Sequence, residues 1–161
     1  MKTKTPQVNL AELRNPQWTP EEAANVELIA GFVQNLMNDH DFDLVLERYN
    51  NSAYTQHNRN IPDGIEGLVG LLRKFTERFP DYSYDVKRII ADSDLVSFHS
   101  HATMKAADRG DDRKGLNIID TWRIQDGEIV EHWDSLQPLD GFMRFYAMMT
   151  GGKIRNSNGV F

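Results

Sequence analysis

One acidic residue in the second half of the chain lies in surroundings that suit acid–base chemistry. Asp120 lies in the apolar run Leu-Asn-Ile-Ile-Asp-Thr-Trp, with Ile118 and Trp122 two residues away on either side. Residues two apart on a strand share a face, so these neighbours would shield the carboxyl group from water. Burial raises the pKa of a carboxyl group and makes it usable as a general base or acid. The structural alternative is a core aspartate neutralised by neighbouring donors.

Two groups of histidines before this aspartate are candidates for the same chemistry. His99 and His101 share one face of a predicted strand, and that face would form a polar pocket wall opposite Asp120 if it turned toward the helices. If it faced solvent, the two residues would have no such role. His57 lies in the polar run Tyr-Thr-Gln-His-Asn, which could close one end of a cavity or serve only as a capping loop.

A third polar group follows in the sequence Glu-His-Trp-Asp at 131–134. On a strand, His132 and Asp134 share one face, and Trp133 lies on the other. An Asp-Gly turn joins this strand to the one before it. A tight two-residue turn would place Asp120 opposite Trp133, and a glycine bulge would place it opposite His132. The sequence leaves both registers open.

The residue types limit the other chemistries. The chain has no cysteine, which excludes thiolate zinc sites, iron–sulfur clusters and a cysteine nucleophile. His99 and His101, with Asp120 or His132 nearby, could supply two imidazoles and a carboxylate to a metal. The usual two-histidine strand motif adds a glutamate shortly beyond the pair, where this chain has lysine and alanine. We therefore expect neither a metal nor another cofactor.

The elements that must position these residues follow from hydrophobic periodicity. Thr19 to Glu22 reads as a capping box that opens a helix. An Asp-Gly turn and alternating residues mark strands in the second half. Helices followed by an antiparallel meander predict an α+β domain, with the helices on one face of the sheet. The predicted helices are 20–38, 41–49, 64–79 and 139–149, and the predicted strands are 82–90, 95–107, 116–125 and 128–136.

Composition bounds the partners and the organisation. The 161 residues carry 24 acids and 18 bases, a net charge of −6, which argues against a nucleic-acid or anionic-membrane partner. No apolar stretch is long enough for a transmembrane helix, and we expect a cytoplasmic protein. The expected organisation is an N-terminal arm at 1–18, a single domain at 19–150 and a loose tail at 151–161.

Several motifs together resemble a known family. They are Tyr-Thr-Gln-His-Asn at 54–58, Ile-Pro-Asp-Gly at 61–64, His-Ser-His at 99–101 and the block Asp-Thr-Trp-Arg-Ile-Gln-Asp-Gly-Glu-Ile-Val-Glu-His-Trp-Asp at 120–134. Over residues 20–145 the chain resembles the SnoaL-like polyketide cyclases of the nuclear transport factor 2-like superfamily. The resemblance implies a cone-shaped, curved, mostly antiparallel sheet packed on three N-terminal helices, with a pocket in the open end, and a homodimer. It also implies a cofactor-free aldol condensation, with a catalytic aspartate at Asp120 and a supporting histidine at His101 or, as a second candidate, His99.

We therefore expect an enzyme that acts on a hydrophobic small-molecule carbonyl compound. Asp120 would remove the proton from the carbon next to the carbonyl, and His101 would donate a hydrogen bond to the enolate oxygen or hold Asp120 in place. The alternatives are a dehydratase or other lyase or isomerase in the same pocket, and a non-enzymatic ligand-binding or dimerisation module. The expected substrate-binding residues are His57, His99, Trp122, His132, Trp133 and Asp134.

Overall fold

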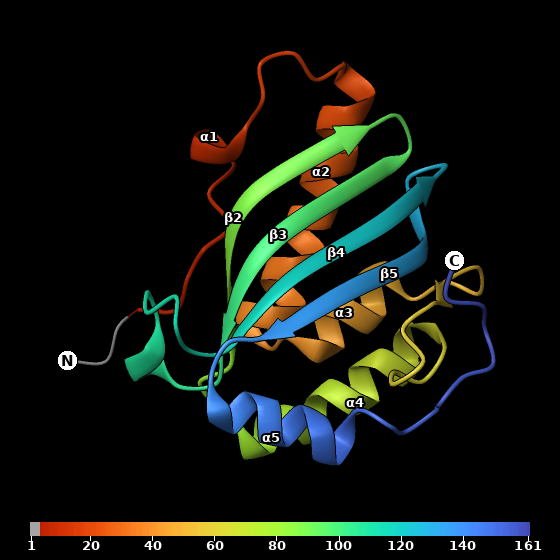
Figure 1. The fold of residues 1–161 in the computed structure, drawn as a ribbon. Helices are drawn as coiled ribbons and strands as arrows, with labels where there is room; N and C mark the ends of the chain where they lie inside the picture. The colour runs from red at the N-terminus through yellow and green to blue at the C-terminus, as the bar shows by residue number, and fades with distance from the viewer. Residues whose placement is uncertain (1–3) are drawn as a thin grey trace.

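The computed structural model describes residues 4–161 and has the helix-then-strand order expected from the sequence (Figure 1). Helix α2 continues as a π-helix over Gln34–Asp39, and a short 3-10 turn spans Ala106–Asp108. The described α-helices are α1 (Leu10–Leu13), α2 (Pro20–Val33), α3 (Phe42–Tyr49), α4 (Gly64–Arg78) and α5 (Gly141–Thr150). The described strands are β1 (Thr55–Gln56), β2 (Ser83–Asp92), β3 (Leu95–Thr103), β4 (Leu116–Gln125) and β5 (Glu128–Pro138).

The strands form one sheet in the order β1-β5-β4-β3-β2. Strands β2 to β5 pair antiparallel, and the short β1 pairs parallel with β5. Figure 1 shows the long strands bending together, with α2 crossing behind them and α3, α4 and α5 gathered toward one end of the sheet. The predicted fold class, a curved and mostly antiparallel sheet packed on helices, is confirmed.

Helix α2 begins as its sequence predicts and supplies much of the core. The hydroxyl oxygen of Thr19 accepts a hydrogen bond from the Glu22 backbone N–H, and the Glu22 carboxylate accepts one from the Thr19 backbone N–H. This closed capping box satisfies donors that the first turn leaves free. The helix buries Ile29 and Phe32 against the sheet, where the Phe32 ring meets Trp122 edge to face.

The hairpin between β4 and β5 adopts neither of the two registers that the sequence left open. The turn is a tight two-residue one at Asp126 and Gly127, both with positive φ. A bulge at Val130 then shifts the pairing, so that Asp120 lies opposite Asp134. The bulge lies on β5 rather than in the turn, and this moves the register in the direction opposite to a glycine bulge. His132 therefore faces the same side of the sheet as Asp120.

The C-terminal tail is bound rather than loose. The Asn60 side-chain amide donates to the carbonyl oxygens of Gly151 and Lys153. The Asn156 amide donates to the carbonyls of Asn58 and Ile61, and the Asn158 amide donates to the carbonyl of Gln56. Figure 1 shows the tail leaving α5 and returning to the loop that precedes α4. The looseness predicted from its glycines and asparagines is wrong, because those asparagines supply the hydrogen bonds.

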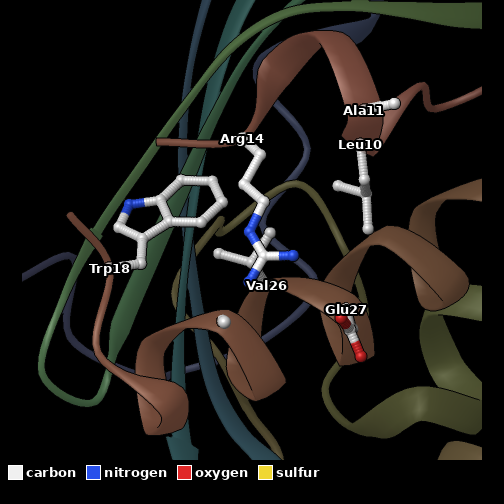
Figure 2. Close-up of a pocket in the computed structure, with 7 residues that line it drawn as sticks. Leu10, Ala11, Arg14, Trp18, Val26 and Glu27 are labelled. Atoms are coloured by element: carbon white, nitrogen blue, oxygen red, sulfur yellow. The ribbon is translucent and has the colours of Figure 1, made fainter. Parts of the chain in front are cut away.

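The N-terminal segment also packs on the domain. A pocket of about 120 Å³ lies between α1 and α2, with Leu10, Arg14 and Trp18 on one side and Val26 and Glu27 on the other (Figure 2). The charged residues that line this pocket are Arg14 and Glu27. Over residues 4–161, no helix has the length and apolar character needed to cross a bilayer.

Candidate active site

A cavity of about 460 Å³ lies between the sheet and the helices. Its walls are mostly apolar and aromatic, with contributions from α4 and α5 such as Leu72, Phe75 and Tyr146. Polar side chains enter from the two central strands and from the loop after β1. A large apolar pocket with few convergent polar groups is the usual form of a small-molecule site. The polar lining residues are Asn58, Asn60, Asp120, His132 and Asp134, together with Thr150 of α5, Arg155 of the tail, and Tyr82 and Tyr84 at the start of β2.

Asp120 lies in the middle of β4 and forms part of the cavity wall. Its side chain is only 3% exposed. One carboxyl oxygen, Oδ1, lies 3.1 Å from Nε2 of His132, and the other, Oδ2, has no hydrogen-bond partner within residues 4–161. Burial raises the pKa of Asp120, and the bond and charge of His132 oppose that effect. The site therefore holds a carboxyl group with raised proton affinity and one buried oxygen without a hydrogen-bond partner.

The hydrogen bonds of Gln56 decide which nitrogen of His132 carries a proton. The Asn58 backbone N–H points at Gln56 Oε1 at 2.9 Å, so that atom must be the acceptor oxygen. His132 Nδ1 lies 3.0 Å from the same oxygen and therefore donates to it. Gln56 Nε2 in turn donates to the hydroxyl of Tyr54 at 3.2 Å. In its neutral form, His132 thus presents an unprotonated Nε2 to Asp120.

This tautomer means that Asp120 and His132 hold one proton between them. Either Asp120 is protonated and donates to Nε2, or His132 is an imidazolium and Asp120 is a carboxylate. Both states keep the 3.1 Å hydrogen bond, and the buried pair is neutral overall in each. When Asp120 is a carboxylate and His132 an imidazolium, the unpartnered Oδ2 of Asp120 can accept a proton from a bound molecule.

Asp134 and Trp122 complete this wall. Both oxygens of Asp134 accept hydrogen bonds from the Asn58 amide, at 2.7 and 2.8 Å. The indole ring of Trp122 stacks on His132, with centroids 5.3 Å apart, and meets Phe98 edge to face. Its Nε1–H has no acceptor within the described chain. The wall thus contains two buried atoms without partners, a donor on Trp122 and an acceptor on Asp120.

Two buried tyrosines also line the cavity. Tyr82 and Tyr84 are hydrogen-bonded to each other. Burial raises the pKa of both hydroxyls, and the negative charge of Asp120 raises it further. Both hydroxyls therefore stay protonated. The bond between them uses the O–H of Tyr84, which leaves the O–H of Tyr82 to donate to an oxygen that gains negative charge.

The structure separates the sequence-predicted histidines from this site. Phe98 pairs with Asp120 in the ladder, so His99 and His101 lie on the opposite, outer face of the sheet. There His101 Nε2 contacts the Lys114 carbonyl at 2.7 Å, and His99 is bonded to Arg88. The prediction that both histidines face Asp120 is wrong, because the apolar residues of β3 occupy the inner face.

His57 and Trp133 also lie outside the cavity. Their rings stack with centroids 4.7 Å apart on the outer face of β5, where His57 contacts Glu131. Trp133 alternates with His132 and Asp134 along β5, and His57 follows the inward Gln56. The expected placement of these two residues at the substrate is therefore wrong as well. Of the eight predicted site residues, those brought together at the cavity are Asp120, Trp122, His132 and Asp134.

Sequence reasoning missed the residues that hold this group in place. Tyr54, Gln56 and Asn58 alternate with His57, and their side chains reach the inner side of the sheet. The same period-two rule that was applied to β4 would have selected them. His57 is the residue of this run with catalytic chemistry, but its neighbours Gln56 and Asn58 make the contacts with His132 and Asp134.

The metal arrangement considered from the sequence does not form, because His99 and His101 lie across the sheet from Asp120. Another set does come together: ligand atoms of Asp120, His132 and Asp134 lie within 4.8 Å of one another. In this set Nε2 of His132 is bonded to Asp120, and both oxygens of Asp134 contact Asn58. A metal ion would have to replace the bond between Asp120 and His132, so the observed arrangement is better suited to proton transfer.

Comparison with known proteins agrees with this fold. Residues 29–132, more than half of the chain, match the model of the SnoaL-like domain. The chain belongs to the SnoaL-like domain family. No curated protein matches this SnoaL-like chain.

Solved structures give the same fold at low identity. A protein from Bacillus cereus ATCC 10987 named a candidate polyketide cyclase is 18% identical, with a TM-score of 0.63 over 95% of each chain. A SnoaL-like candidate polyketide cyclase from Jannaschia sp. CCS1 is 16% identical, with a TM-score of 0.62 over 89% of this chain and all of its own. AclR from Streptomyces galilaeus, named a candidate hydroxylase, is 20% identical, with a TM-score of 0.58 over 81% of this chain and 98% of its own. These likenesses show the fold, and their different names leave the reaction to be argued from the site.

Proposed function

We propose that this SnoaL-like protein is a cofactor-free enzyme that moves a proton next to the carbonyl group of an apolar small molecule. The reaction is an aldol-type cyclisation or a related isomerisation. The observation that carries the proposal is the buried Asp120 in the wall of an apolar cavity, with one oxygen bonded to His132 and the other without a partner.

In the reactive state Asp120 is a carboxylate and His132 an imidazolium. Oδ2 of Asp120 takes a proton from the carbon next to the substrate carbonyl, and the electron pair of that C–H bond forms the enolate. The enolate carbon then attacks a second carbonyl of the same molecule, and the new alkoxide takes the proton back from Asp120. The protein returns to its starting state with no net gain of protons. General-base catalysis of this kind contributes about 10²- to 10⁴-fold.

The enolate oxygen needs a donor, and His101 on the outer face does not supply one. The Trp122 indole N–H is unpartnered, and the Tyr82 hydroxyl stays protonated with its O–H left to donate. A preorganised donor of this kind is worth about 10²- to 10³-fold in rate. These groups support the proposal because they stand in the same cavity as Asp120.

The test is product analysis on aromatic compounds that carry two ketone groups within reach of each other. Mass spectrometry should show a product of unchanged mass, and NMR a new carbon–carbon bond; loss of water would instead indicate a dehydratase. Asp120→Asn should abolish product formation, because the amide cannot accept the proton. Asp85→Asn is the matched control, since Asp85 lies on the outer face beside Lys87.

Two results would contradict the proposal. The first is an Asp120→Asn variant that converts a substrate at the wild-type rate. The second is tight binding of these compounds with no conversion of any of them, which would favour a ligand-binding module.

A further inference from the structure

The mouth of the cavity carries positive charge that the proposed proton transfer does not use. Arg155 is the charged residue of the tail that lines the cavity, and its backbone N–H donates to the Arg59 carbonyl at 2.7 Å. Lys153 precedes it on the same segment and is joined through its carbonyl to Asn60. Three cationic residues therefore lie on two chain segments that run side by side.

No acidic residue belongs to either segment. Residues 51–62 and 150–161 contain no aspartate or glutamate, although the whole chain has a net charge of −6. Within residues 4–161, the side chains of Arg59, Lys153 and Arg155 form no ion pair. An unpaired, exposed arginine at the edge of an apolar cavity, with two further cations on adjoining segments, favours a ligand with a negative group at that end.

Hydrogen bonds from neighbouring asparagines hold Arg155 in place against the rest of the domain. The Asn156 amide, next to Arg155, bonds the carbonyls of Asn58 and Ile61. The Asn158 amide bonds the Gln56 carbonyl and the Asp63 carboxylate. These bonds hold the tail against the same segment that positions Asp134 through Asn58. The cationic mouth and the acid–base wall are thus parts of one hydrogen-bonded structure.

We propose that the substrate is an apolar carbonyl compound that carries a carboxylate, and that Arg155 binds this carboxylate at the mouth. The guanidinium fork matches the two oxygens of a carboxylate. The carboxylate of Asp134 at the inner wall contacts only the neutral Asn58 amide within the described chain and repels an anion, so the molecule enters with its neutral carbonyl end first. The orientation toward Asp120 rests on the function proposed above, whereas the anion preference does not.

The experiment compares 2-naphthoate with its neutral analogue 2-naphthamide by isothermal titration calorimetry. The wild type should bind naphthoate about fivefold more tightly, the value of an ion pair at a solvent-exposed mouth. High salt should reduce this preference, because exposed charges are screened. Arg155→Gln should remove it while leaving naphthamide affinity unchanged. Arg14→Gln, an exposed arginine at the separate pocket of Figure 2, is the matched control and should keep it.

Equal affinity of the wild type for the two probes overturns the proposal, as does an Arg155→Gln variant that weakens both probes alike. Failure of naphthoate to bind also overturns it. Because no turnover is measured, these outcomes are independent of whether Asp120 is a catalytic base.

Discussion

Replacing Gln56 with leucine should destabilise the protein strongly, although Gln56 touches no substrate in the proposed mechanism. The side chain is fully buried and makes three polar contacts, with His132, the Asn58 backbone and the Tyr54 hydroxyl. Leucine fills similar space but leaves all three partners unsatisfied. At about 1–3 kcal/mol for each orphaned buried group, the loss should be at least ~3 kcal/mol. For a chain of this length that corresponds to a fall in melting temperature of about 6–12 °C.

The assay is thermal and urea unfolding of the purified protein, followed by circular dichroism. Gln56→Glu is the informative second variant, since its carboxylate can accept from His132, from the Asn58 N–H and from the Tyr54 hydroxyl. Thr55→Val, on the same short strand, is the control because its hydroxyl makes only a long contact of 3.4 Å to the Ala53 carbonyl. A Gln56→Leu variant as stable as Thr55→Val would refute the hydrogen-bond assignment and, with it, the deduced tautomer of His132.

Three further outcomes follow from the geometry. His101→Gln should leave kcat/KM unchanged in the product assay, since His101 lies across the sheet from Asp120; a large loss would contradict the assigned face. Thr19→Ala should lower the free energy of unfolding by about 1 kcal/mol in urea titration, because it opens the capping box; no change would argue against the cap. Burial raises the pKa of Asp120 above its ordinary 3.8, so the folded state keeps a proton that the unfolded state loses. The contribution of Asp120 to the free energy of unfolding is therefore greatest below pH 3.8 and falls as pH rises through the raised pKa. Asp120→Asn should flatten this fall in melting temperature, and an unchanged slope would show that another group causes it.

The architecture was readable from the sequence because local signals agreed with one another. The capping box at Thr19 and the Asp-Gly turn each act over a few residues, and the structure places element ends close to the predicted ones. Asp120 and Trp122 were placed correctly for the same reason: their alternation with apolar neighbours depends on β4 alone.

The rest of the site depended on information that is not local. Which face of β3 turns toward the helices was decided by Phe98 and its apolar companions, since placing them in the core stabilises the fold more than placing His99 and His101 there would. The bulge at Val130 sets the partners of Asp120. No residue type in this part of β5 marks the position of the bulge in the sequence. Gln56 reaches His132 only because β1 pairs parallel with β5 across a long separation in the chain.

The most direct measurement of the proposed chemistry is hydrogen–deuterium exchange at the carbon next to a ketone. In D₂O the wild-type protein should speed the loss of the C1 hydrogens of 2-tetralone, a bicyclic ketone small enough for the cavity, as followed by NMR. Asp120→Asn should slow this catalysed exchange by about 10²- to 10⁴-fold, while Asp85→Asn should not change it. Exchange by Asp120→Asn at the wild-type rate, or a wild-type rate no higher than that of buffer alone, would contradict the role of Asp120 as the base.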